Sequence, residues 1–257
     1  MEYQSLTIHK KNELVRGADD YSIFAKRALN AIYYFIQKEN LYSYETITIP
    51  FTLMRKFLNL QKEQNYVDIM RSALLELKKP IELYHFIHPQ NQKEYPWYAT
   101  SFLNDVAFYK QDQRWYVQIE VSKLILYLMQ QKGNFTKLDL LIYQNRVRTK
   151  YSMKLYEFLK SFQNYKEVSF NYEHILRLFK LQESKTYKYF ANLKRLVERQ
   201  TKEIQKKTDL SYLQLEVDKK KKTFLFKLDP RAKQQTPSDQ IKEANLEQLL
   251  KRNFLKF

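Results

Sequence analysis

The chain has 257 residues, of which 44% are hydrophobic, and its 21 Tyr and 17 Phe can fill one large core or two ordinary ones. A formal net charge of +17 indicates a polyanionic partner, either nucleic acid or an anionic membrane surface. The lack of Cys excludes disulfides and thiolate metal sites, and it is compatible with a reducing compartment.

We expect no targeting or membrane segment. The N-terminal stretch MEYQSLTIHKKNEL lacks the apolar centre of a signal peptide. The longest purely apolar run, residues 124–129, is far too short to span a bilayer. These features predict a cytoplasmic protein.

The first half of the chain, residues 1–135, opens with a polar segment over 1–18 that shows little periodicity. Residues 20–39 then carry apolar side chains at helical spacing, which predicts a long helix. Asp19 or Asp20 is the expected N-cap of this helix, because a short carboxylate accepts a hydrogen bond from a free amide of the first turn.

A short strand and two helices are expected next. The stretch TITIP alternates apolar and polar residues, which is typical of a strand, and Pro50 can then open a helix over 51–59. A further helix is expected over 65–79, and it must end before Pro80.

Residues 81–121 are rich in aromatic and β-branched residues, which predicts a small antiparallel sheet. Ser122 is the expected cap of a helix that runs to about Lys132. Gly133 is one of only two glycines, and we interpret it as the joint between two halves.

The second half, residues 138–235, is expected to begin with a helix or helix pair over 138–165, followed by an extended piece at 168–170. A short helix capped by Asn171 comes next. After the polar turn QESK, a longer helix is predicted in TYKYFANLKRLVERQTKEIQKK.

The longer helix has two contrasting faces. Its apolar face carries Phe190, Leu193, Val197 and Ile204. The opposite face is predicted to carry Lys188, Asn192, Arg195 and Arg199. Two helices, a tight turn and a basic second helix are typical of a helix-turn-helix that enters the major groove.

Two alternating stretches, LSYLQLEV and TFLFKL, follow and are joined by the turn DKKKK. They predict a hairpin. A hairpin after a helix-turn-helix is the wing of a winged helix.

The two halves share the order long helix, short strand, helix, helix, hairpin. At an offset of 121 residues, Leu60 coincides with Leu181 and Tyr66 with Tyr187. The predicted fold is therefore α+β and helix-rich, with two tandem winged-helix domains related by an internal duplication.

Charge is uneven along the chain. Residues 138–235 hold 23 Lys and Arg against 11 Asp and Glu, a net charge of +12, whereas residues 1–137 have a net charge of +4. The second domain is thus the expected main reader of DNA, and the first a secondary contact. The tail, residues 236–257, is predicted to be an amphipathic helix.

The DNA-binding candidates fall into four groups. The recognition helix and its entrance provide Lys185, Thr186, Lys188, Tyr189, Asn192, Arg195 and Arg199. The wing tip provides Lys219, Lys220, Lys221 and Lys222. A segment before a helix provides Arg146, Arg148 and Lys150, which would grip phosphate or form a charged interdomain joint. The first half provides the weaker set Gln64, Asn65, Arg71 and Lys78.

Three segments carry a family resemblance: HKKNELVRGADDYS, KYSMKLYEFLKSF and YKYFANLKRLVERQTKEIQKKTDL. The chain resembles the plasmid replication initiators that bind iterons with two winged-helix domains. The resemblance covers residues 8–230 and is firmest over 146–228. The family commonly has Asn after Glu-Ile, where this chain has Gln205.

The resemblance implies sequence-specific binding of double-stranded origin repeats, opening of adjacent AT-rich DNA, and recruitment of a host replication initiator and helicase. It also implies that monomers initiate replication, whereas dimers paired through the first domain repress the initiator's own gene. No cofactor is implied.

Other functions remain open on the sequence alone. A winged-helix transcription regulator would share the second half, and RNA binding also suits basic and aromatic residues. Two glycines cannot form a phosphate-binding loop. A rolling-circle nuclease needs a metal-binding His pair separated by one residue, whereas His85 and His88 are separated by two. We therefore expect no catalysis and no metal.

Overall fold

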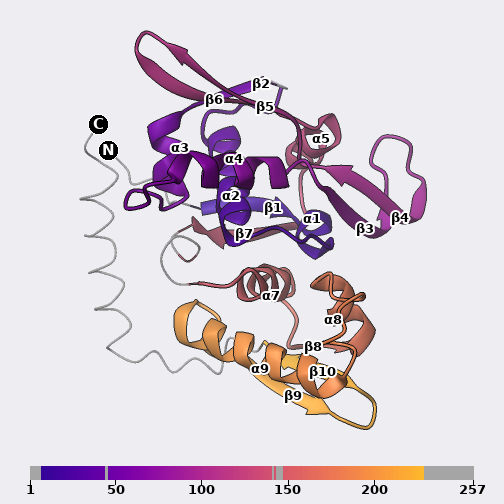
Figure 1. The fold of residues 1–257 in the computed structure, drawn as a ribbon. Helices are drawn as coiled ribbons and strands as arrows, with labels where there is room; N and C mark the ends of the chain where they lie inside the picture. Colours follow the sequence, from indigo (N-terminus) through magenta and orange to yellow (C-terminus); the bar gives the residue numbers. More distant parts are fainter. Residues whose placement is uncertain (1–6, 44–45, 141, 143–146, 229–257) are drawn as a thin grey trace.

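The structure is a computed structural model that describes residues 7–43, 46–140, 142 and 147–228. Two winged helices follow one another along the chain, as Figure 1 shows. Buried side chains from both form one continuous hydrophobic core. The predicted α+β fold with two winged-helix units is confirmed.

The second winged helix has the expected order of elements. These are α7 (Lys150–Lys160), β8 (Glu167–Asn171), α8 (Tyr172–Leu178), α9 (Phe190–Lys207), β9 (Gln214–Asp218) and β10 (Thr223–Lys227). The strands form an antiparallel sheet in the order β8-β10-β9. Asn171 caps α8 as predicted, because its side chain accepts a hydrogen bond from the His174 amide at 2.8 Å.

The first winged helix repeats this arrangement. It comprises α2 (Ile23–Lys38), β2 (Thr46–Pro50), α3 (Phe51–Phe57), α4 (Tyr66–Glu76), β5 (Leu103–Gln111) and β6 (Arg114–Val121). Its strands pair antiparallel in the order β2-β6-β5. The hairpin of β3 (Pro80–Ile87) and β4 (Glu94–Ser101) is inserted after α4 as a separate two-stranded sheet. The strands predicted over 81–121 therefore belong to two sheets, because β5 and β6 pair with β2 instead.

The internal duplication extends to backbone detail. β2 and β8 begin 121 residues apart, and so do α3 and α8. Asn59 and Lys180, also 121 apart, both take the left-handed conformation, with φ of 60° and 54°. The amide that follows donates to the carbonyl five residues earlier in both turns: Leu60 to Arg55 at 3.1 Å, and Leu181 to Leu176 at 2.9 Å. The same turn therefore joins the two helices of each helix-turn-helix.

The ends of the first half form a sheet of their own. β1 (Thr7–Lys11) pairs antiparallel with β7 (Phe135–Asp139), and α1 (Asn12–Arg16) follows β1. The short helix α5 (Lys123–Gln130) precedes β7. The segment 1–18, which showed little periodicity, thus contains a strand and a helix.

The structure differs from the sequence prediction in several details. The helix or helix pair expected over 138–165 does not include residues 138 and 139, which end strand β7; Leu140 and Ile142 are helical, and α7 begins at Lys150. Strand β7 also crosses the boundary that the sequence predicted between 135 and 138. The cap of α2 is Ser22 rather than Asp19 or Asp20, since the Ser22 hydroxyl accepts from the Ala25 amide at 3.2 Å.

Ser122 precedes α5 as predicted, but its side chain makes no capping hydrogen bond. The predicted tail helix over 236–257 lies outside the described residues.

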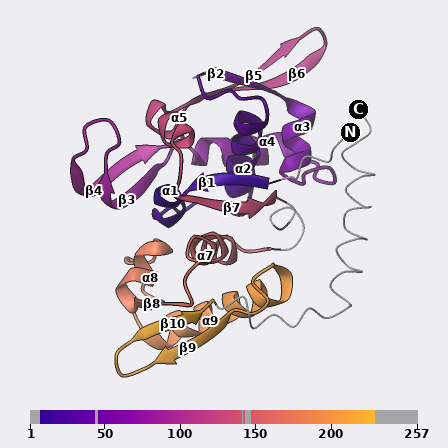
Figure 2. The same cartoon turned by 180° about the vertical axis from the view of Figure 1, so that it is seen from behind.

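The two wings lie at opposite ends of the molecule. The loop between β5 and β6 is at the upper left of Figure 1, and the loop between β9 and β10 is at the lower right. Figure 2 shows the same separation from behind. None of the helices in the described segments is both long and apolar enough to cross a bilayer.

Candidate nucleic-acid interface

The helix α9 divides into a buried and an exposed face as its sequence period requires. Its buried side chains recur at helical spacing: Leu193, Leu196, Val197, Gln200, Thr201 and Ile204. Opposite them, a row of four exposed cations follows the i, i+4, i+7, i+11 period: Arg195, Arg199, Lys202 and Lys206. We call these four side chains the α9 basic row.

The basic row is not neutralised by neighbouring acids. Within the described residues, none of its four side chains forms an ion pair, whereas Lys194 pairs with Glu198 and Lys207 with Glu203 along the flanks of the helix. Burial opposes ionisation of Glu203, but hydrogen bonds from Lys207 and the Arg148 amide hold its pKa below the ordinary value. The outward face of α9 therefore offers uncompensated positive charge to a polyanion.

The residues predicted to lie on the exposed face of this helix do not all lie there. Arg195 and Arg199 lie on the exposed face as predicted. Lys188 lies in the turn before the helix, because α9 begins only at Phe190. The amide nitrogen of Asn192 donates to the Thr186 carbonyl at 2.7 Å, which holds the turn closed.

The entrance to α9 is fixed from the neighbouring helix. The hydroxyl of Tyr172, the first residue of α8, donates to the carbonyls of Tyr187 and Lys188 at 2.6 and 2.7 Å. Lys185 and Thr186 are exposed on this turn. Tyr189, the residue before α9, is 66% exposed. The helix-turn-helix thus presents an ordered polar and aromatic entrance beside the basic row.

The second wing carries its four lysines on a structured turn. The Asp218 carboxylate accepts from the amides of Lys220 and Lys221 at 2.8 and 2.9 Å. Lys222 has a φ of 52°, and its carbonyl accepts from the Tyr172 amide at 2.9 Å. Tyr172 therefore holds both the wing and the entrance to α9 in place. All four side chains, Lys219, Lys220, Lys221 and Lys222, are exposed.

The exposed face of α4, the corresponding helix of the first half, carries little net charge. Arg71 on α4 pairs with Asp68 at 2.8 Å, and Lys78, beyond the end of α4, pairs with Asp105 at 3.3 Å. Gln64 and Asn65 are exposed before the helix. The four weaker candidates therefore lie around α4, but both of their cations have carboxylate partners.

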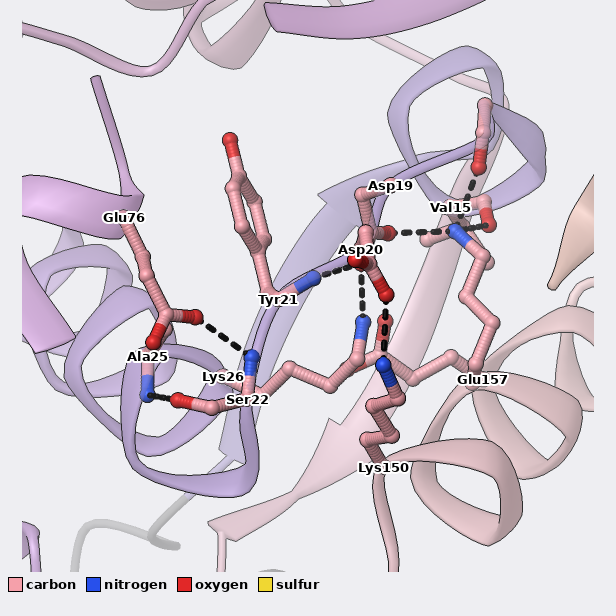
Figure 3. Close-up of polar contacts among 12 residues, drawn as sticks. Val15, Asp19, Asp20, Tyr21, Ser22, Ala25, Lys26, Glu76, Lys150 and Glu157 are labelled. Carbon is pink, nitrogen blue, oxygen red and sulfur yellow. Dashed lines mark hydrogen bonds and ion pairs between the residues drawn. The ribbon is translucent and has the colours of Figure 1, made fainter. Parts of the chain in front are cut away.

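The segment before α7 joins the two halves. Lys150 extends to Asp20 at 2.5 Å, which agrees with the charged-joint interpretation that the sequence left open (Figure 3). The Arg148 side chain is exposed. Arg146 lies outside the described residues.

A buried ion cluster, which the sequence did not reveal, lies behind this joint. Asp19 accepts from Lys26 of α2 at 2.6 Å and from Lys154 of α7 at 2.7 Å, with every side chain at most 8% exposed. Figure 3 shows Lys26 directed at Asp19. Lys10 pairs with Glu157 at 2.8 Å alongside. Because α7 belongs to the second winged helix, these charges fix one half against the other.

Burial and charge compete within this cluster. Burial would raise the pKa of Asp19, but Lys154 and Lys26 outweigh it and hold the pKa well below the ordinary value. Burial lowers the pKa of Lys154, and Asp19 opposes that effect. The cluster thus depends on each partner staying charged.

Metal-binding residues do not gather in the described part of the chain. No three His, Cys, Asp or Glu side chains there lie close enough to hold a metal ion. His85 lies 3.4 Å from Glu94 on the exposed β3–β4 hairpin.

No curated protein matches the sequence of this chain. The solved structure of domains 2 and 3 of RctB, a selenomethionine derivative, is 10% identical and covers 79% of this chain and 80% of its own, with a TM-score of 0.45. The family model described as "Initiator Replication protein, WH1" matches residues 7–160, more than half of the chain. The chain therefore belongs to the initiator replication protein family, and it is a replication initiator.

Proposed function

We propose that this initiator acts on plasmid DNA by binding repeated duplex sites, or iterons, at the replication origin. The second winged helix is the principal reader. It places α9 in a major groove and its lysine wing along the neighbouring backbone. The first winged helix contacts an adjacent stretch of the same duplex.

The observation that carries this proposal is the α9 basic row. Its Arg side chains can donate two parallel hydrogen bonds to guanine, whereas its Lys side chains bind bases or phosphates as point charges. Tyr172 holds the turn before α9 and the wing together. A cationic helix face and a cationic wing on one winged helix fit a groove and its flanking phosphates.

The buried ion cluster supports binding by both halves together. Because it fixes α7 against the first winged helix, the two reading surfaces keep a set separation. Two readers that each occupy one helical turn fit direct repeats of roughly 20 base pairs. Such repeats are expected in DNA flanking the gene.

The test is a selection of duplexes from a random library by the full chain, followed by shift assays at matched salt. We expect one preferred duplex that competes for the protein better than a scrambled duplex, a single strand or RNA. Equal binding of all four nucleic acids would contradict duplex reading. Preference for RNA or single strands would replace duplex reading with another function.

Origin opening and host recruitment are further parts of the proposal. The full chain should increase permanganate reactivity of AT-rich DNA beside its selected sites, and it should retain the host initiator or helicase on that DNA. Sequence-specific binding without either effect would leave a transcription regulator as the better description.

We further propose that the chain acts without catalysis. Purified protein should neither hydrolyse ATP nor nick supercoiled origin DNA in the presence of magnesium or manganese. Reproducible nicking that a single tyrosine substitution abolishes would replace the binding-protein description with that of a nuclease.

A further inference from the structure

The wing of the first winged helix is longer than that of the second. β5 and β6 have 9 and 8 residues, compared with 5 in each of β9 and β10. The pairing of β2 with β6 reaches only as far as Tyr116. The last two rungs, Lys110 with Trp115 and Gln111 with Arg114, therefore extend beyond the third strand as a two-stranded ribbon.

The ribbon ends in a tight turn. Asp112 and Gln113 have φ values of 47° and 64°, which is the conformation that a two-residue hairpin loop requires. Such a loop follows the natural twist of its strands, so it holds the terminal side chains in a defined direction.

Aromatic contacts connect the base of this wing to the start of α4. Phe108 of β5 packs on Phe51 at 5.2 Å between ring centroids, and Phe51 packs on Tyr66, the first residue of α4, at 6.1 Å. Lys110 lies two residues further along the strand, about 7 Å beyond Phe108. Trp115 pairs with Lys110, so both lie on the same side of the sheet as Phe108.

The tip has an unusual surface for a soluble hairpin. Trp115 is 53% exposed although an indole is a large apolar group. Lys110 lies opposite Trp115 on the same face of the ribbon, whereas Arg114 lies on the other face, and Asp112 is the carboxylate of the turn. An apolar ring beside a cation matches the side chains that enter the minor groove, where cations meet phosphate and the ring inserts between base steps.

We propose that Trp115 enters the minor groove of duplex DNA next to the major-groove segment that α4 faces. This inference rests on the proposed function and identifies how the first half contributes to it. The first winged helix then binds DNA mainly through an aromatic ring and the amides of Gln64 and Asn65. Binding of this kind releases few counterions, unlike that of the α9 basic row.

The two tryptophans of the chain allow a direct test. Trp97→Phe leaves Trp115 as the only indole, and Trp115→Phe leaves only Trp97, which is 58% exposed on β4. Acrylamide quenching of each full-length variant is measured with and without the duplex selected by the wild-type chain. We expect the duplex to protect Trp115 severalfold and to leave Trp97 accessible.

Affinity and groove are tested separately. Trp115→Ala should weaken binding by about 5- to 150-fold, the range for removal of a nucleobase–aromatic stack, without changing its salt dependence. Lys110→Ala with Arg114→Ala should reduce the log–log salt slope by about 0.9 for each phosphate that these cations neutralise in the wild type. Replacing A·T by inosine·C at the contacted step keeps the minor-groove acceptors, so it should preserve protection of Trp115.

Each remaining outcome has a defined meaning. If the duplex binds but leaves Trp115 accessible, or if Trp115→Ala binds like the wild type, this inference is overturned while the proposed function stands. Protection of Trp115 by raising the protein concentration without DNA would assign the tip to self-association and also overturn it. If no duplex is selected, the proposed function fails first.

Discussion

The helices α4 and α9 hold equivalent places in the two winged helices, yet they present different charges to solvent. Arg71 is paired with Asp68, whereas Arg195 belongs to a basic row without ion pairs among the described residues. Duplication has thus kept the scaffold while the two exposed helix faces diverged.

The two units share the features that determine the path of the backbone between the helices of each helix-turn-helix. The turn after α3 and that after α8 have a left-handed residue and the same hydrogen bond. Buried Leu60 and Leu181 follow these turns. Exposed positions carry no such constraint, so one unit can specialise in charge and the other in apolar contact without altering the fold.

The largest expected effect comes from breaking the joint between the two units. Lys154→Ala leaves Asp19 with one of its two cations in a buried site, and it should lower the free energy of unfolding by about 3–5 kcal/mol in urea denaturation. The control is Lys150→Ala on the same helix, whose partly exposed pair with Asp20 should contribute about 0–1 kcal/mol. Equal small losses would show that the cluster does not hold the halves together.

The same cluster predicts acid sensitivity. Because the folded-state pKa of Asp19 is depressed, its contribution is present above the ordinary value of 3.8 and is lost as the pH falls below it. Denaturation at a series of pH values should show stability declining below about pH 4. Lys154→Ala should flatten that decline, and an unchanged slope would remove Asp19 as its source.

The two wings should differ in how they bind. Changing Lys219, Lys220, Lys221 and Lys222 to Ala should weaken true and scrambled duplexes about equally. It should also reduce the log–log salt slope by about 0.9 for each phosphate that the wing no longer neutralises. The matched control is Trp115→Ala on the first wing, which should leave the slope unchanged. A selective weakening of the true duplex would make the second wing a base reader.

The smallest effect concerns the paired cation of α4. Asp68→Ala frees Arg71 from its carboxylate, so the salt slope should rise by at most about 0.9. Salt titrations of the variant and wild type measure this change. No change would show that α4 does not approach phosphate.

The sequence predicted what depends on local periodicity. The strand and helix starts offset by 121 and the exposed Arg195 and Arg199 follow from apolar spacing. The Asn171 cap follows from the preference of helix N-termini for Asn. Lys202 and Lys206 continue the same period beyond Arg199, so extending the period along the helix would have included them.

The sequence did not predict what depends on distant pairing. The stretch FTKLD is strand β7 only because β1 lies beside it, more than a hundred residues away along the chain. Nothing in the local pattern marks Lys26 and Lys154 as buried, since a lysine on a helix is ordinarily solvated. The local pattern predicts only that Trp115 lies in a strand. The structure shows that the pair of Trp115 and Lys110 lies beyond the last residue of β6 that pairs with β2.

The most direct test of the difference between the two units is a competition titration with Arg195→Ala and Arg71→Ala, using the selected duplex and its scrambled counterpart. Removal of a bidentate hydrogen-bond pair to guanine corresponds to roughly 1–3 kcal/mol. Arg195→Ala should therefore lose discrimination by roughly 5–150-fold, whereas Arg71→Ala should keep it. If the two variants lose discrimination equally, or if Arg71→Ala loses more, the second winged helix is not the principal reader.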